Sequence, residues 1–384
     1  MSELIWLNDK NKKELNMKIK HARALSTSLI LSLALSGTVN ASSPEHHDDT
    51  KKHKAVKQGF KLKSYKGGKV VVANRASGTI SVIATKNDRV LATIKLPIGE
   101  NSPEPMYVVH GAKSDSVFVG DRANDRVVVF NDKNFKIKAI IPAGKGVFHM
   151  WADPGEYQLW VSNDIDNTMT IIDPITFKVI TTLSLPKELI DLGAKPHDVV
   201  LDSSGDAAYI SLIASEHPKD FVLKYDTHSF IETARAEVGN DPHLSLTRKN
   251  KVLYVPTQED NAVYILNRSD LSLVKILNIP GAHGAAIPRN GDTFYTTNLS
   301  GEGVDALYAI DAQTNSIIGE AVNAPFAIPH NVVLNNMANK LYITHSGGQS
   351  DKLTVYNVDK ESKQASYKKV LTVGKNPFGL AYVE

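Results

Sequence analysis

The sequence predicts an all-β fold, a seven-bladed β-propeller built from four-stranded antiparallel blades. From about residue 59 onward, short β-branched and aromatic runs alternate with turn residues, which is typical of strands. These runs recur as units with a period in the forties, which is typical of propellers and solenoids. The run expected to form the second strand of each unit occurs seven times, so we expect seven blades.

Residues 196–238 illustrate the expected blade. A strand at 198–201 precedes a Ser-Ser-Gly-Asp turn, and further strands are predicted at 208–212, 221–225 and 232–238. The second strands of the seven units read VVVAN at 70–74, VFVGD at 117–121, LWVSN at 159–163, AYISL at 208–212, LYVPT at 253–257, FYTTN at 294–298 and LYITH at 341–345.

These second strands resemble the tyrosine-valine-threonine-asparagine signature of the YVTN-repeat propeller family, and the resemblance covers about residues 60–384. It implies the propeller fold without specifying a function. Propellers of this family are similar in fold to the propeller domain of nitrous oxide reductase and to the haem-d1 domain of cytochrome nitrite reductase. The resemblance to nitrous oxide reductase implies copper held by propeller histidines, but this chain lacks that family's adjacent His pairs and Cys ligands.

Closure of the ring is expected to use the C-terminus. The second strand at 70–74 precedes every predicted innermost strand, so it has no inner partner of its own. We expect the C-terminal strand at 379–383 to pair with it, which removes an open sheet edge. An alternative makes 60–65 that inner strand and leaves an eight-bladed or imperfectly closed ring.

Residues 1–41 are predicted to be a signal peptide. Basic residues from Lys18 to Arg23 precede an apolar stretch at 24–35 and a small-x-small site that ends at Ala41, and Met17 is an alternative start. We therefore expect a periplasmic or secreted protein, cleaved near Ala41. Residues 42–58 are polar and predicted to be a disordered linker, which leaves 59–384 as the propeller.

Charge and composition exclude several classes of partner. Residues 1–41 carry six basic and three acidic residues, a difference of three that accounts for the whole formal net charge of +3. The remainder is formally neutral, so no nucleic-acid partner is expected. The apolar stretch is shorter than the ~20 residues of a membrane span, so none is predicted. The chain has no Cys, which excludes disulfides and thiolate metal sites.

The candidate site lies at the start of the innermost strands. Five of the seven equivalent positions are His, although 59–384 contains only nine His in all. Such positions form a ring at one mouth of a propeller's central channel. The predicted metal ligands are His149, His197, His243, His283, His330 and Met106, and Phe378 occupies the seventh position.

The residue types in this ring favour a transition metal. Imidazole and thioether donors suit copper, and also zinc or nickel, whereas calcium and magnesium require oxygen ligands that these seven positions lack. Asp198 and Asp241 flank His197 and His243 and would either orient an imidazole or accept a turn N–H. His110 and His345 would be orienting partners or rim residues. In the alternative interpretation, all the ring imidazoles are structural and bond backbone carbonyls or water.

Three functions fit this sequence. The first is an exported binding protein whose channel mouth holds a copper-like ion, a small ligand or a protein partner. The second is a metal-dependent periplasmic enzyme, redox or lyase, that uses the same His ring, and lactonases also use this architecture. The third is a structural or surface propeller that binds other proteins. No catalytic residue is assigned, because a base, an oxyanion donor and a pocket must be seen in mutual geometry.

Overall fold

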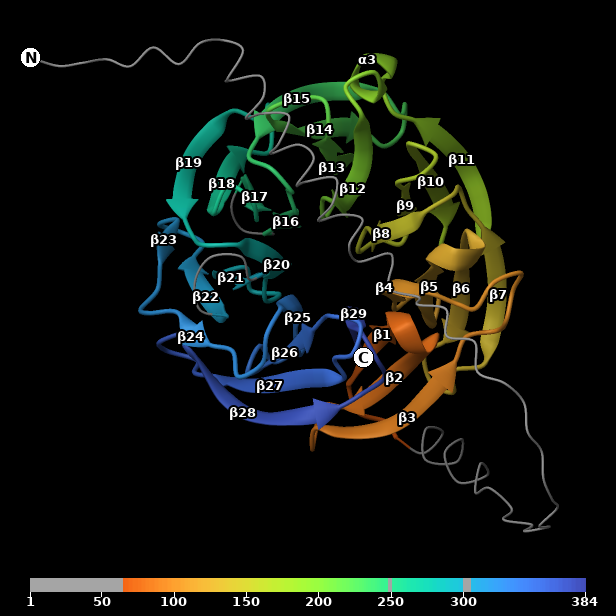
Figure 1. Cartoon of the computed structure of the whole chain (residues 1–384), viewed down its shortest axis with the longest axis vertical. Helices are drawn as coiled ribbons and strands as arrows, with labels where there is room; N and C mark the ends of the chain where they lie inside the picture. Colours follow the sequence, from red (N-terminus) through yellow and green to blue (C-terminus); the bar gives the residue numbers. More distant parts are fainter. Residues whose placement is uncertain (1–64, 248–250, 300–304) are drawn as a thin grey trace, which may run out of the picture. The chain divides into compact units, whose positions relative to one another are not determined.

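The computed structural model describes residues 65–247, 251–299 and 305–384 (Figure 1). The predicted signal peptide at 1–41 and linker at 42–58 lie outside these residues and stay predictions. Within the described part of the chain, no helix is long and apolar enough to cross a membrane.

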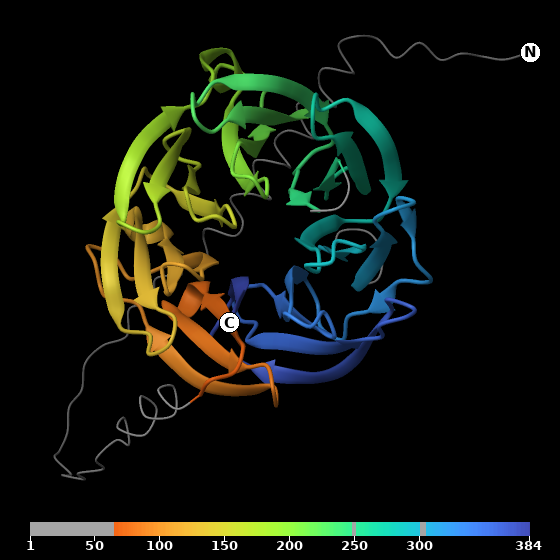
Figure 2. The same ribbon diagram turned by 180° about the vertical axis from the view of Figure 1, so that it is seen from behind.

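Seven antiparallel sheets are arranged as blades around a central axis, and the same ring is seen from behind in Figure 2. From the axis to the rim, blade 1 contains β29 (Pro377–Val383), β1 (Lys69–Asn74), β2 (Thr79–Ala84) and β3 (Arg89–Lys95). Blade 2 contains β4 (Pro105–Gly111), β5 (Ser116–Asp121), β6 (Arg126–Asn131) and β7 (Ile137–Pro142). Blade 3 contains β8 (Val147–Ala152), β9 (Leu159–Asn163), β10 (Thr168–Asp173) and β11 (Lys178–Ser184).

The remaining blades follow the same order. Blade 4 contains β12 (Ala194–Leu201), β13 (Ala207–Ala214), β14 (Asp220–Asp226) and β15 (Glu232–Val238), and α3 (Lys187–Ile190) precedes it. Blade 5 contains β16 (Ser245–Leu246), β17 (Val252–Thr257), β18 (Ala262–Asn267) and β19 (Leu273–Asn278). Blade 6 contains β20 (Ala282–Ala286), β21 (Thr293–Asn298), β22 (Ala306–Asp311) and a divided rim strand, β23 (Ser316–Ile317) and β24 (Val322–Asn323). Blade 7 contains β25 (Pro329–Leu334), β26 (Lys340–His345), β27 (Lys352–Val358) and β28 (Ala365–Thr372).

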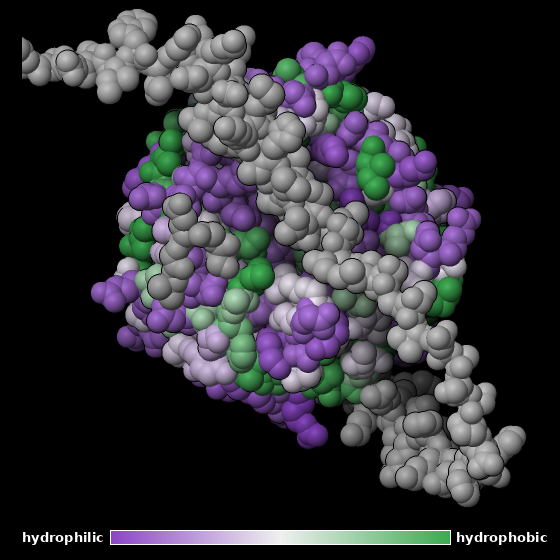
Figure 3. Space-filling view, viewed as in Figure 1, coloured by the Kyte–Doolittle hydropathy of each residue, from purple (hydrophilic) through white to green (hydrophobic). Residues whose placement is uncertain are grey.

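The second strands form the packed interior of the propeller. All seven sequence-predicted second strands are confirmed, as β1, β5, β9, β13, β17, β21 and β26. Every residue of β1, β5 and β9 is buried, because both faces of such a strand pack against neighbouring blades. Large side chains of the second strands, such as Trp160 of β9 and Tyr254 of β17, are 0% exposed. The rim strands are mostly exposed, and hydrophobic residues are scattered among hydrophilic ones on the face drawn in Figure 3.

The C-terminal strand closes the ring. β29 pairs antiparallel with β1, with Val70 opposite Tyr382 and Val72 opposite Leu380. β2 pairs with the other edge of β1, so both edges of that strand are taken. This confirms closure by the C-terminus and a ring of seven blades. The alternative inner strand at 60–65 is wrong, because β29 occupies its place beside β1.

A buried carboxylate joins blade 7 to blade 1 at the closure. Asp88 is 1% exposed, and it accepts hydrogen bonds from Lys340 Nζ (2.9 Å), Lys368 Nζ (2.7 Å) and Tyr342 Oη (2.6 Å) of blade 7. Burial alone would raise the pKa of Asp88, but these hydrogen bonds lower it below its usual range. The seam between the first and last blades is therefore fastened by side chains as well as by backbone pairing.

We expect Asp88→Ala to destabilise the protein by about 3 kcal/mol, because the change leaves the largely buried ammonium of Lys340 without its carboxylate. Denaturant unfolding measures the loss. Asp115→Ala is the matched control, because Asp115 also has a positive φ but forms an exposed ion pair with Lys133. Equal losses in the two variants would show that the Asp88 cluster does not stabilise the closure.

Candidate functional site

The ring positions lie at β-bulges near the start of the innermost strands. In six of the seven blades the pairing between the first and second strands shifts at this point. In blade 3, Phe148 and His149 of β8 together oppose the single residue Ser162 of β9, just as His197 and Asp198 oppose Ser211 in blade 4. The prediction that His149 is equivalent to His197 is therefore wrong, because Phe148 occupies that position and His149 lies one residue later. A bulge leaves one residue unpaired and redirects its side chain. In blade 5, His243 instead lies in the loop just before β16.

Hydroxyl groups of the second strands hold these bulges in place. Thr297 Oγ1 accepts a hydrogen bond from the Gly284 N–H of its own blade (3.0 Å) and donates one to the carbonyl oxygen of His330 in the next blade (2.6 Å). Thr344 acts in the same way between blade 7 and the Phe378 carbonyl oxygen of blade 1 (2.8 Å). The equivalent Ser162 and Ser211 also bond carbonyl oxygens of the following blade. Each hydroxyl therefore sets the spacing between adjacent ring residues.

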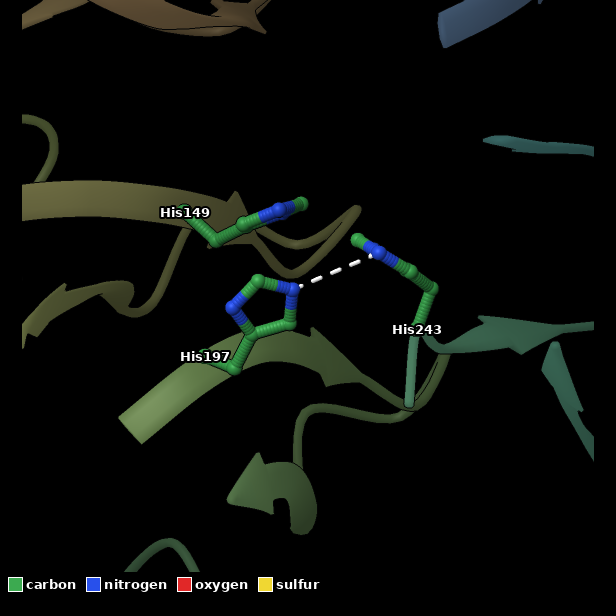
Figure 4. A group of neighbouring side chains, drawn as sticks. All are labelled: His149, His197 and His243. Atoms are coloured by element: carbon green, nitrogen blue, oxygen red, sulfur yellow. Dashed lines mark hydrogen bonds between the residues drawn. The ribbon is translucent and has the colours of Figure 1, made fainter. Parts of the chain in front are cut away.

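The five predicted imidazoles come together as one arc. Ring centroids are 4.6 Å apart for His197 and His243, 3.8 Å for His243 and His283, and 4.6 Å for His283 and His330. The His149 ring lies 5.3 Å from that of His197. Four of the five are at most 5% exposed, and the His197 side chain is 14% exposed. Figure 4 shows His149, His197 and His243 approaching one another from separate segments.

The other part of the ring is aromatic. Met106, predicted as a ligand, is fully buried in an apolar cluster with Tyr107 and Phe378, and Phe148 packs against that cluster. Its role as a ligand stays a prediction that no contact in this cluster supports. The Tyr107 ring lies 3.7 Å from that of His149, and the Phe378 ring lies 4.2 Å from that of His330. The sequence analysis missed Tyr107, which follows Met106 in its bulge, and Phe148, which occupies the ring position of blade 3.

Asp198 orients the His149 imidazole and lies near that of His243. Its Oδ1 lies 2.7 Å from His149 Nδ1, and its Oδ2 lies 3.8 Å from His243 Nδ1 while accepting the Leu244 N–H at 2.9 Å. A carboxylate on one imidazole nitrogen fixes the ring and leaves the other nitrogen as donor. The free nitrogen of His149 is therefore Nε2.

Asp241 provides a carboxylate on the more exposed side. Its Oδ1 is 3.3 Å from His197 Nε2 and 4.0 Å from His243 Nε2, and its side chain is 21% exposed. The residue has a φ of 58°, a left-handed conformation that Asp adopts more readily than most residues. Asp198 and Asp241, which the sequence suggested as orienting groups, thus both lie against the imidazoles.

These donor atoms are spaced like the ligands of one metal ion. His197 Nε2 and His243 Nε2 are 3.3 Å apart (Figure 4), and Asp241 Oδ1 completes a triangle with sides of 3.3 and 4.0 Å. Ligands held at ~2.0–2.1 Å around a tetrahedral zinc ion lie about 3.3–3.4 Å from each other. Ligand nitrogens of His149, His197 and His243 also lie within 4.8 Å of one another. The arrangement can therefore supply to a small cation either the three imidazoles or the imidazoles of His197 and His243 with the carboxylate of Asp241.

Four of the buried imidazoles are neutral at pH 7. Burial, together with nearby imidazoles, lowers the pKa of His197 and His330 to about 3. Burial, with the neighbouring imidazoles, also holds the pKa of His243 and His283 well below the usual range. Neutral imidazole is the form that binds metals, so protons do not compete for these nitrogens at neutral pH.

Two arginines stand beside the aromatic part of the ring. The guanidinium of Arg75 lies 5.5 Å from the centre of the Phe378 ring, and that of Arg122 lies 5.7 Å from the centre of the Phe148 ring. They begin the short helices η2 (Arg75–Ser77) and η3 (Arg122–Asn124), which follow β1 and β5. Arg75 pairs with Glu104 at 2.6 Å, and Arg122 pairs with Asp164 at 2.8 Å. Sequence analysis did not identify them, since single basic residues in turns carry no signal.

The two other histidines considered from the sequence bond elsewhere. His110 Nε2 lies 3.4 Å from Asp132 Oδ2. His345 has Nδ1 near the Ala327 carbonyl oxygen (3.2 Å) and Nε2 near Thr354 Oγ1 (2.9 Å), so both its nitrogens have partners. The structure does not bring either residue into the ring contacts described above, and both are explained by local hydrogen bonding.

Acid should destabilise the metal-free protein through these buried imidazoles. An unfolded His has a pKa near 6.5 and the folded His330 one of about 3, so the unfolded state gains protons first as the pH falls below ~6.5. Between pH 7 and pH 5, we expect the free energy of unfolding to fall by about 2 kcal/mol less in His330→Gln than in the wild type. Denaturant unfolding at several pH values measures this, with His228→Gln at an exposed position as control. Parallel pH profiles for wild type and His330→Gln would contradict it.

Known structures share the fold at low sequence identity. The periplasmic gluconolactonase PpgL from Pseudomonas aeruginosa aligns with a TM-score of 0.65 at 14% identity, over 83% of this chain and 99% of that one. A putative 6-phosphogluconolactonase from Bacteroides fragilis aligns with a TM-score of 0.63 at 14% identity, over 84% and 99%. Dihydro-haem d1 dehydrogenase NirN aligns with a TM-score of 0.56 at 12% identity, over 82% and 74%. At these identities the likeness shows the fold alone.

Sequence comparison identifies the family. No curated protein matches the chain. The family described as lactonase, seven-bladed β-propeller matches residues 38–275, which is more than half of the sequence. That assignment agrees with the seven four-stranded blades and with the closure by β29. The chain therefore belongs to the lactonase family of seven-bladed β-propellers.

Proposed function

We propose that the protein is an exported metal-binding propeller that holds a copper or zinc ion through His149, His197 and His243, with Asp241 as an adjacent carboxylate. The triangle of His197 Nε2, His243 Nε2 and Asp241 Oδ1, with sides of 3.3 to 4.0 Å, carries this proposal. The free Nε2 of His149 supports it, because Asp198 bonds the opposite nitrogen of that ring. Export rests on the predicted signal peptide at 1–41.

The donor set favours a divalent transition ion. Three imidazoles and a carboxylate suit Zn²⁺ and Cu²⁺, and Cu²⁺ ordinarily binds such a set more tightly. Met106 is packed against Tyr107 and Phe378, so the thioether that would favour Cu(I) is engaged in apolar contacts. The second-strand signature supports membership of the YVTN-repeat group. The His ring supports an analogy with the copper-holding propeller of nitrous oxide reductase that extends to the ligand type alone.

We expect the purified, untagged protein to retain the first added equivalent of Cu²⁺ or Zn²⁺ through gel filtration. His149→Ala/His243→Ala should lose it, because that change removes two of three imidazole donors. Elemental analysis measures the ratio of metal to chain, and His110→Ala is the control with a His removed outside the ring.

A second variant keeps this test decisive if the double alanine variant folds poorly. Asp198→Asn retains all the ligands but weakens the orientation of His149, and such changes ordinarily cost 10–100-fold in metal affinity. Competition with a chelator measures that affinity, and circular dichroism reports the fold. Wild-type protein that retains no metal would overturn the proposal and leave a ligand- or protein-binding propeller as the better account.

A second candidate is metal-dependent hydrolysis of a lactone, which membership of the lactonase family favours. Imidazoles with a pKa of about 3, such as those of His197 and His330, are weak general bases at pH 7. Hydrolysis would therefore rely on a bound ion, which supplies an activated water and polarises a carbonyl group. Arg75 and Arg122 would attract a negatively charged substrate to the neighbouring side.

Glucono-lactone is the first substrate to test, since one similar structure is a periplasmic gluconolactonase and another is a putative 6-phosphogluconolactonase. We expect metal-loaded protein to open the lactone faster than chelator-treated protein, because the neutral imidazoles alone are weak bases. Acid release followed with a pH indicator measures the rate. An equal rate in both samples, after subtraction of spontaneous hydrolysis, would reject the enzymatic role and leave metal binding intact.

A further inference from the structure

The ring contains more donors than one ion uses. Five imidazoles and the carboxylate of Asp241 lie around it, whereas a tetrahedral ion takes four ligands. If the first ion binds His149, His197 and His243 beside Asp241, then His283 and His330 remain. Their position on the same arc raises the question of what they bind.

His283 is the clearest candidate for a ligand of a second ion. It is 4% exposed, and neither its Nδ1 nor its Nε2 has a hydrogen-bond partner within the described residues. Leaving a buried polar group unsatisfied costs about 1–3 kcal/mol, so a buried His without a partner at this place indicates a bound species. Asp241, His243 and His283 also form a second group whose ligand atoms all lie within 4.8 Å of one another.

His330 stands next to His283 with one nitrogen already engaged. Its ring centroid is 4.6 Å from that of His283, and its Nδ1 lies 2.8 Å from Asn331 Nδ2. Phe378 packs on the opposite side of the His330 ring at 4.2 Å and restricts its rotation. The nitrogen left for a ligand is Nε2. The Asn331 amide nitrogen donates to Nδ1, which places the ring proton on Nε2, so ligation through Nε2 requires the amide to present its oxygen to a protonated Nδ1 instead.

We propose that the ring holds a second divalent ion beside the first, bound by His283 and His330, with Asp241 shared between the two ions. The inference rests on the proposed metal-binding function. A carboxylate between two ions is common in two-metal sites, where it offsets their mutual repulsion. Asp198 adds a second carboxylate on the side of the first ion, through His149 and His243.

Charge predicts the order in which the two ions bind. The guanidinium of Arg75 lies 5.5 Å from the centre of the Phe378 ring, which packs on the His330 ring at 4.2 Å. The positive charge of Arg75 disfavours a cation at His330, whereas the first site has both Asp198 and Asp241 close to its imidazoles. The His149, His197 and His243 site therefore fills first, and the His283 and His330 site fills more weakly.

Titration of the metal-free full-length protein with Cu²⁺ tests this inference. We expect two equivalents to bind, the second at least tenfold more weakly by calorimetry. The electron paramagnetic resonance signal of the first Cu²⁺ should broaden or diminish when the second binds, because a shared carboxylate couples neighbouring ions. His283→Ala/His330→Ala should bind one equivalent with an unaltered signal, and His110→Ala should behave as wild type.

The outcomes separate the second site from the first. No bound ion in the wild type would reject the proposed metal-binding function itself. One equivalent in the wild type, with His283 satisfied by water, would overturn the second site and leave the first intact. Two equivalents in the His283→Ala/His330→Ala variant would also overturn it, since the second ion would then bind elsewhere. If that variant folds poorly, the change in the first Cu²⁺ signal on binding of the second decides the matter, because an ion bound far from the ring would leave that signal unaltered.

Discussion

The pairing of β29 with β1 is the interaction on which the rest of the structure depends. A sheet edge left open at blade 1 would expose unpaired backbone groups and leave the seventh inner strand without a place. Closure sets the number of inner strands around the axis, and hence the number of ring positions. The Asp88 cluster reinforces the same seam, so strands from both ends of the chain act together.

Within the closed ring, backbone irregularity creates the site. A regular strand alternates its side chains between two faces, and a bulge interrupts that alternation and redirects one residue. Six blades have such a bulge at the ring position, and hydroxyls such as Thr297 and Thr344 fix it to the next blade. The imidazoles therefore converge because hydrogen bonds between neighbouring blades hold each bulge in place.

The neutral charge of the buried imidazoles limits the chemistry that the ring can perform. Burial keeps imidazoles such as His197 neutral, which suits metal ligation and makes them weak proton acceptors at pH 7. Membership of the lactonase family is compatible with hydrolysis, but on this scaffold such chemistry would need an ion to activate water. Metal binding is accordingly the first property to establish, and catalysis would depend on it.

The sequence alone determined the strands, the seven repeats, the closure by the C-terminus and the gathering of histidines at the start of the innermost strands, although His149 lies one residue beyond the position of the other four. These features follow from periodic burial and turn chemistry, which are local and repeat along the chain. Only the tertiary structure decided that Asp198 orients His149, that Asp241 lies against His197, and that Met106 lies in an apolar cluster with Tyr107. The reason is physical: these contacts join residues about one blade apart in the sequence or lie within bulges, so strand alternation does not encode them. Their geometry exists only once the blades pack and the ring closes.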